Sequence, residues 1–220
     1  MSTRYGQLAF GPAALRRQEQ VGSFVAYGAR LGGPDEGPDV LEPQVQALIR
    51  ESWHFFLGST TPAGWPYIQH RGGPKGFVHV LDERTLGFAD VAGNRQFVTT
   101  GNVESNDRVA LFFIDYARKR RVKIYGRARV VEGRDDPELL AGLAIVGDEE
   151  LARPERSFLV AVEAVDVNCS RHIEPLWGRE SVERMKELYQ RDVREARAES
   201  ERLRERVTEL EAQLAKRSEM

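Results

Sequence analysis

The sequence predicts a mainly β protein of the α+β class, built on an antiparallel barrel and ending in a charged C-terminal helix. Short apolar runs of strand length alternate with turn signals such as TPAG, RGGP, DERT and VAGN through the middle of the chain. The phosphate-binding patterns GxGxxG and GxxxxGKS/T, typical of doubly wound parallel sheets and P-loop folds, do not occur. Many short strands with few helices between them favour an antiparallel barrel.

Length, charge and cysteine content exclude several classes of protein. The chain has 220 residues, 41% of them hydrophobic, and its 32 basic and 34 acidic residues give a net charge of −2. This balance argues against electrostatic capture of nucleic acid. The apolar runs fall short of the roughly 18–20 residues that span a bilayer, and the N-terminus lacks the apolar core of a secretory signal. We therefore expect a cytoplasmic protein that binds neither membrane nor nucleic acid, and the single Cys169 excludes an intrachain disulfide or a multi-cysteine metal site.

The body of the chain is expected in two parts: residues 1–52 form a helical and loop segment that packs on the barrel, and residues 53–178 form the barrel. In the first part, helices are predicted around Pro12–Gln20 and Pro43–Glu51. In the second, Asn94 and Asp136 stand where N-caps would precede helices Arg95–Val103 and Pro137–Val146. The predicted strands are Trp53–Ser59, Trp65–His70, Gly76–Leu81, Thr85–Ala89, Arg108–Ile114, Arg121–Val131 and Phe158–Val167.

Residues 179–220 form a third, very different part. They hold 11 basic and 11 acidic residues among 42, and no Gly or Pro. Leu203, Val207, Leu210 and Leu214 follow a heptad seam, with the first and third at d and the others at a. The seam is polar earlier, at Lys186 and Ser200. The pattern favours a coiled coil that pairs two chains, and a solvated single helix is the alternative.

Three clusters in the barrel region predict a site for a phosphate. The turn RGGPKG carries Arg71 and Lys75, and its glycines let backbone approach a planar ligand. The segment GNRQ follows a strand and precedes a helix, where an anion would meet backbone N–H groups and a guanidinium. The basic run before Lys123 leads into a strand that places Arg121 and Lys123 on one face. Each signal is weak alone, and their coincidence in a net-acidic chain strengthens the prediction.

The stretches FADVAGNRQ, NDRVALFFID and RRVKIYGRARVVE resemble the flavin-binding split-barrel proteins related to pyridoxamine 5′-phosphate oxidase. With RGGPKGFVHVLDERT and CSRHIEP, they resemble the branch described only as oxidase-like FMN-binding proteins. The resemblance covers about residues 45–178 and not the tail. It implies a six-stranded antiparallel split barrel and a homodimer that binds one FMN at each of two sites between the subunits.

The resemblance also implies the residues that contact FMN. The strand from Lys75 through Gly76, Phe77 and Val78 to His79 would run along the flavin and its ribityl chain, with His79 near the phosphate. Ala89 and Asp90 would make the next contact. Asn94, Arg95 and Gln96 would bind the phosphate, and Arg121 would come from the second subunit. In a flavin protein, Arg71 or Lys75 could stabilise charge on the reduced ring, and the alternative is that they only cap the turn from solvent.

The expected function is that of an FMN-dependent oxidoreductase acting on an unidentified small molecule. The chain lacks the C-terminal arginine and histidine segment with which the oxidases hold the vitamin phosphate, so oxidase activity itself is not expected. No catalytic residue and no metal ligand is assigned. The alternative is a non-catalytic module of the same fold that carries a flavin, haem or deazaflavin as a sensor or carrier.

Overall fold

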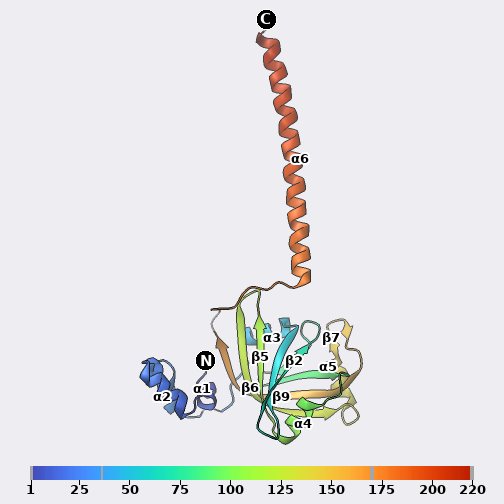
Figure 1. The fold of residues 1–220 in the computed structure, drawn as a ribbon. Coiled ribbons are helices and arrows are strands. Elements are labelled where there is room, and N and C mark those ends of the chain that lie inside the picture. The colour runs from blue at the N-terminus through green and yellow to red at the C-terminus, as the bar shows by residue number, and fades with distance from the viewer. Residues whose placement is uncertain (1, 36, 169–170, 219–220) are drawn as a thin grey trace. The chain divides into compact units, whose positions relative to one another are not determined.

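The computed structural model describes residues 2–35, 37–168 and 171–218 (Figure 1). It divides into two compact units, Met1–Glu174 and Pro175–Met220. The first unit contains the sheet and the shorter helices. The second contains α6 (Arg179–Ser218), a single helix of 40 residues. Cys169 lies outside the described residues.

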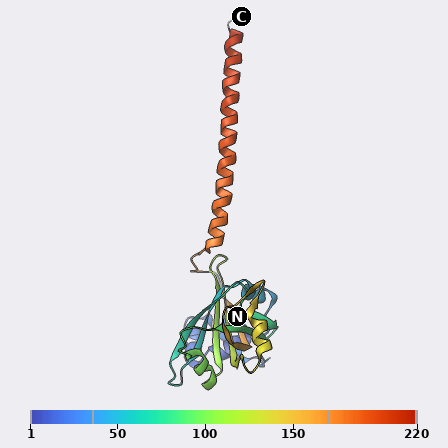
Figure 2. The same ribbon diagram turned by 90° about the vertical axis from the view of Figure 1, so that its right-hand side faces the viewer.

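Within the described residues, seven strands form one sheet in the order β2-β1-β5-β6-β9-β4-β3, and every neighbouring pair is antiparallel. The sheet twists strongly in both ribbon views without a hydrogen-bonded closure between its edge strands β2 and β3 (Figures 1 and 2). The strands are β1 (His54–Thr60), β2 (Pro66–Gly72), β3 (His79–Asp82), β4 (Thr85–Val91), β5 (Arg108–Asp115), β6 (Arg120–Glu132) and β9 (Pro154–Asn168).

The architecture confirms the predicted antiparallel split barrel, and an observed strand overlaps each of the predicted strands. The main sheet of the described residues has seven strands, one more than the six that the resemblance implies. The strand β9 begins at Pro154, four residues before the predicted Phe158, and β3 begins at His79 and not at Gly76. The difference at β3 has a local cause. The preceding residues form a turn instead: Gly76, with φ 86°, donates its N–H to the Ser52 carbonyl, and Phe77 donates to the Pro74 carbonyl.

The barrel interior is filled by the alternate residues of its strands. Phe55, Phe88, Phe113 and Phe158 are almost completely buried, and their ring centroids are 5.0–5.3 Å apart in the contacts 55–88, 55–113 and 88–158. Aromatic pairs at such distances contribute about 0.5–1.5 kcal/mol beyond the burial of their area. This cluster forms the packed core next to the end of the barrel that is described below.

The helices of the first unit follow local signals where such signals exist. The helices α2 and α3 have the predicted bounds, and α5 begins, as predicted, after Asp136, whose carboxylate accepts a hydrogen bond from the Leu139 N–H at 2.9 Å. The helix α5 ends at Ala144 because the next two residues pair with Glu149–Glu150 in a small hairpin. The helix α1 and the 3-10 turns η1 and η2 were not predicted. The bounds are α1 (Thr3–Ala9), α2 (Pro12–Gln20), η1 (Ser23–Val25), η2 (Gly28–Gly32), α3 (Pro43–Glu51), α4 (Val98–Ser105), α5 (Pro137–Ala144), β7 (Ile145–Val146) and β8 (Glu149–Glu150).

The predicted charged tail helix is present as α6, with half-exposed apolar residues along its length. Among the described residues, no helix combines the length and the apolar character needed to cross a bilayer.

Candidate functional site

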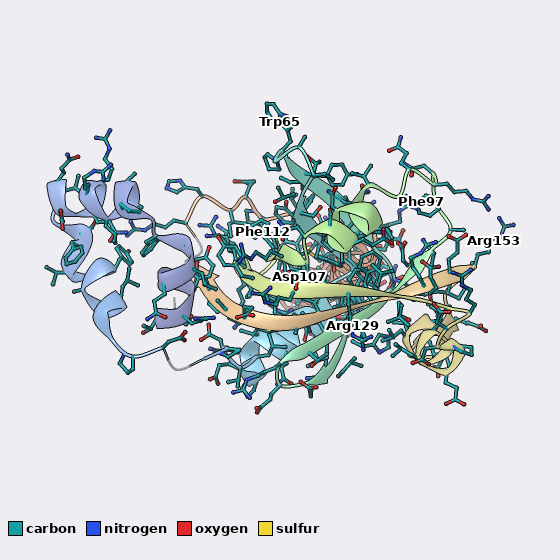
Figure 3. All side chains as sticks on the ribbon, turned by 90° about the horizontal axis from the view of Figure 1, so that it is seen from below. Trp65, Phe97, Asp107, Phe112, Arg129 and Arg153 are labelled. Atoms are coloured by element: carbon teal, nitrogen blue, oxygen red, sulfur yellow. The ribbon has the colours of Figure 1, made fainter. Side chains whose placement is uncertain are left out.

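A polar cleft of about 200 Å³ opens at one end of the barrel, between β2, the segment that joins β4 to α4, and the start of β9. Figure 3 shows Phe97 and Arg153 at this end, and the Ala92 N–H donates to the Arg153 carbonyl at 3.0 Å. The lining residues are Tyr67, Gln69, Arg71, Asp90, Val91, Gly93, Asn94, Arg95, Gln96, Phe97, Val98, Thr99, Thr100, Glu155 and Arg156.

One wall of the cleft is the inner face of β2. Tyr67, Gln69 and Arg71 are half-buried and alternate with exposed neighbours, as the period of two in a strand requires. The Tyr67 hydroxyl donates to Gln69 Oε1 at 2.6 Å. The three side chains therefore share one fixed face toward the cleft.

The floor of the cleft is an ion pair that spans the open side of the barrel. Arg71 on β2 donates a hydrogen bond to Asp90 on β4, although no backbone ladder joins these two strands. The Arg71 guanidinium carbon lies 5.4 Å from the ring centroid of Phe158 and 5.9 Å from that of Phe88. Its Nε is buried and has no hydrogen-bond partner among the described residues. The side chain thus ties the edge strand β2 to β4, the strand next to the opposite edge, and keeps one donor unused.

Asp90 holds a second arginine, from β9. Arg156 Nη1 lies 3.1 Å from Asp90 Oδ2, and its Nε lies 3.1 Å from Glu132. Burial alone would lower the pKa of Arg156, but the hydrogen bonds that Arg156 donates to Glu132 and Asp90 outweigh it and raise the pKa, so the guanidinium stays charged. The Phe97 ring covers it at 5.0 Å.

The loop before α4 has a conformation that the sequence did not reveal. Arg95 and Phe97 are in the left-handed region, with φ 59° and 54°, and two such residues cannot continue a helix. The predicted helix start at Arg95 is therefore wrong, and α4 begins at Val98. Asn94 is not its N-cap: the Asn94 side chain accepts a hydrogen bond from the Gln96 N–H at 3.1 Å, which closes a local turn. Strained non-glycine backbone of this kind is concentrated at functional sites.

The consequence is a helix N-terminus without a side-chain cap. The first residues of α4, Val98 to Thr100, line the cleft, so the backbone donors of the first helical turn face the same region as the loop side chains. Such an N-terminus attracts anions through its N–H groups and the helix dipole.

The charges of the lining residues also favour an anion. Three cations, Arg71, Arg95 and Arg156, stand against two carboxylates, Asp90 and Glu155, which leaves one positive charge. Arg71 and Arg156 are engaged by Asp90. Among the described residues, Arg95 makes no ion pair, and its side chain is exposed at the cleft. The guanidinium of Arg95 is therefore available to a ligand.

The structure brings five of the twelve sequence-predicted site residues together in this cleft: Arg71, Asp90, Asn94, Arg95 and Gln96. The other seven lie elsewhere in the single chain. Lys75 and Gly76 are in the turn before β3, and Phe77 and Val78 are buried in the barrel core. The remaining three are also outside the cleft: His79 lies opposite Gly87, Ala89 packs against α5, and Arg121 lies at the far end of β6.

Sequence reasoning did not identify Tyr67, Gln69, Phe97 or Arg156 as site residues. The alternation in PYIQHRG could have placed Tyr67 and Gln69 on the same face as Arg71. Arg156 has no local signal, because its place depends on the pairing of β4 with β9, in which it lies opposite Asp90.

Two histidines outside the cleft make the stability of this unit sensitive to acid. His54 is 5% exposed, its Nδ1 is buried without a hydrogen-bond partner, and burial together with the charge of His70 lowers its pKa below 6.5. Burial lowers the pKa of His79 in the same direction. The fold therefore disfavours the protonated form of both side chains.

We expect the free energy of unfolding to fall as the pH drops below about 6.5, because the histidines then bind protons more readily in the unfolded chain than in the folded one. His54→Phe, which keeps an aromatic ring beside Trp53 and His70, should flatten this dependence. Urea unfolding at pH 7.5 and 5.5 measures it. An equal loss of stability on acidification in both proteins would exclude His54 as a source.

Comparison with known proteins gives a family and a set of distant structures. The family model described as Pyridoxamine 5′-phosphate oxidase matches residues 41–169. No curated protein matches the chain.

Solved structures align with the chain at low sequence identity. HupZ of Group A Streptococcus is 13% identical, with 61% of this chain and 97% of that chain covered and a TM-score of 0.46. Protein Rv2991 of Mycobacterium tuberculosis is 16% identical, with 63% and 93% covered and a TM-score of 0.46. General Stress Protein 26 of Bacillus anthracis is 13% identical, with 55% and 88% covered and a TM-score of 0.41.

Proposed function

The chain belongs to the pyridoxamine 5′-phosphate oxidase family, and from this membership and the cleft we propose that it is an FMN-binding flavoprotein that oxidises or reduces a small molecule. The observation that carries the proposal is the uncapped N-terminus of α4 beside the unpaired, charged Arg95. Together they form an anion site at the end of the barrel.

The donors in the cleft suit the phosphate of FMN. Asn94 and Gln96 offer side-chain amides, Arg95 offers a guanidinium, and the first turn of α4 offers backbone N–H groups. The buried, unpartnered Nε of Arg71 is a further donor at the floor. Hydrogen bonds to a charged group are each worth about 1.5–3 kcal/mol, so a few of them suffice to anchor a dianion.

The size of the cleft supports a site shared between two chains. Its volume of about 200 Å³ is below the roughly 300–1,000 Å³ of typical cofactor and drug sites, so one chain offers room for only part of FMN. Arg121 and Glu132 lie at opposite ends of β6, and Glu132 is the one that contacts Arg156 in the cleft. Arg121 is therefore too far from the cleft to act within its own chain. We propose a homodimer in which the second subunit completes the site with Arg121.

FMN, when bound, supplies the hydride acceptor or donor that the reaction needs. The protein's part is to hold and polarise it. Asp90 fixes the Arg71 and Arg156 guanidiniums in place, and both remain charged in a half-buried setting where a cation stabilises nearby negative charge strongly. No proton-transfer residue is assigned.

The visible spectrum of the purified protein tests this proposal. We expect two flavin bands, or their appearance on reconstitution with FMN, and bleaching when a reductant is added. A Soret band in place of them would favour the haem-carrying alternative. A colourless protein that takes up no FMN would refute the flavin function.

A further inference from the structure

The apolar residues of the helix α6 form a stripe that bears on how the protein assembles. Leu203, Val207 and Leu210 are 57%, 53% and 42% exposed, although they share one stripe of the helix. We propose that α6 pairs with α6 of a second copy of this chain as a parallel, in-register, two-stranded coiled coil. The proposal does not depend on the bound cofactor.

The heptad positions can be followed over the whole helix, with apolar residues at most of them. Steps of three and four residues continue the a and d positions without a break from Val182 to Leu214. Valine stands at the a positions Val193 and Val207 and leucine at the d positions Leu203 and Leu210, a combination that favours two strands over three or four. The a positions are Lys186, Val193, Ser200, Val207 and Leu214, and the d positions are Val182, Tyr189, Ala196, Leu203 and Leu210.

The flanking charges select the orientation. In a parallel, in-register dimer, each g residue faces the e residue five positions later on the other chain. Every such pair that contains two charged residues joins opposite charges, and by symmetry each forms twice. The pairs are Asp192 with Arg197, Glu199 with Arg204, and Arg206 with Glu211.

In the fully overlapped antiparallel arrangement, the flanking charges mostly repel. There, e residues face e residues and g residues face g residues, and most of the charged pairs are repulsive. The repulsive pairs are Arg197 with Arg197, Glu199 with Glu199, and Glu183 with Glu211, and the attractive pair is Asp192 with Arg206. This arrangement also sets Leu210 opposite Lys186, so that one of the two leucines at d positions loses its apolar partner.

Some of the flanking charged residues also form ion pairs within their own helix, but they remain available to the second helix. Glu199 lies 3.4 Å from Arg202 and Arg206 lies 2.8 Å from Glu209, but all four side chains are more than half exposed. Exposed pairs of this kind contribute little and rearrange readily. Lys186 and Ser200 at a positions weaken the seam but penalise shifted registers, which is the usual effect of a polar residue there.

Cysteine cross-linking of the full chain tests the orientation. In a Cys169→Ser background, Leu210→Cys places identical thiols face to face only in the parallel, in-register pair. Leu203→Cys gives an independent reading one heptad earlier. We expect both to form an intermolecular disulfide with diamide much faster than the matched control Glu205→Cys, which stands at the outward f position. Cross-linking at 210 and 203 that is no faster than at 205 would overturn the proposal.

Charge reversal tests the pairing itself. Arg204→Glu in the Leu210→Cys chain turns two attractive contacts into two repulsive ones and should slow cross-linking about fivefold or more. Adding Glu199→Arg restores the opposite charges and should restore the rate, whereas Glu205→Arg at the f position should leave it unchanged. A double variant that stays as slow as Arg204→Glu would contradict the proposed register.

Discussion

Replacing Asp90 with alanine is expected to lower the free energy of unfolding by about 3–5 kcal/mol, the cost of breaking a buried ion pair from one side. Asp90 is shared by Arg71 and Arg156, whose side chains are 19% and 10% exposed. Without the carboxylate, two guanidiniums stay charged in the mouth of the barrel, and the side-chain tie between β2 and β4 is lost. The loss is a large part of the roughly 5–15 kcal/mol that stabilises a typical domain.

Urea unfolding measures this effect, with Asp107→Ala as the matched control. Asp107 also pairs with an arginine, Arg127, but both side chains are about half exposed. An exposed pair contributes roughly 0–1 kcal/mol, so the control should hardly shift the midpoint. Equal losses for the two variants would show that the Asp90 pair does not close the barrel.

Arg95→Ala is expected to weaken FMN binding by about 1.5–3 kcal/mol, or roughly tenfold to 150-fold, because it removes a charge-assisted hydrogen bond to the phosphate. Arg95 is exposed and makes no ion pair among the described residues, so its removal should leave the free energy of unfolding nearly unchanged. The loss would then belong to binding and not to folding.

Titration of the apoprotein with FMN, followed by quenching of the flavin fluorescence, gives the affinity. Arg16→Ala removes the same charge from the exposed surface of α2, away from the cleft-lining residues, and should bind FMN as the wild type does. An Arg95→Ala protein with the same affinity as Arg16→Ala would remove Arg95 from the phosphate site.

The sequence predicted those parts of the fold that depend on local patterns. The strands follow from period-two alternation, and α5 follows from Asp136 at its cap before a proline. The start of α4 could not be predicted, because the left-handed conformations of Arg95 and Phe97 are imposed by their surroundings and are not favoured by either residue type.

The same distinction holds for the site. Arg71, Asp90 and the GNRQ segment could be proposed because they stand in recognisable short motifs. Arg156 enters the site only through the strand register that sets it opposite Asp90, 66 residues away. The role proposed for Arg121 needs a second chain, since Arg121 does not line the cleft of its own chain.

The most direct test of the account compares FMN with riboflavin, which differs from it only by the phosphate. If the phosphate is anchored by Arg95 and the N-terminus of α4, the apoprotein should bind one FMN per chain and should bind riboflavin at least about tenfold more weakly. Equal affinities for the two flavins, or no binding of FMN, would contradict the assignment of this cleft as a flavin phosphate site.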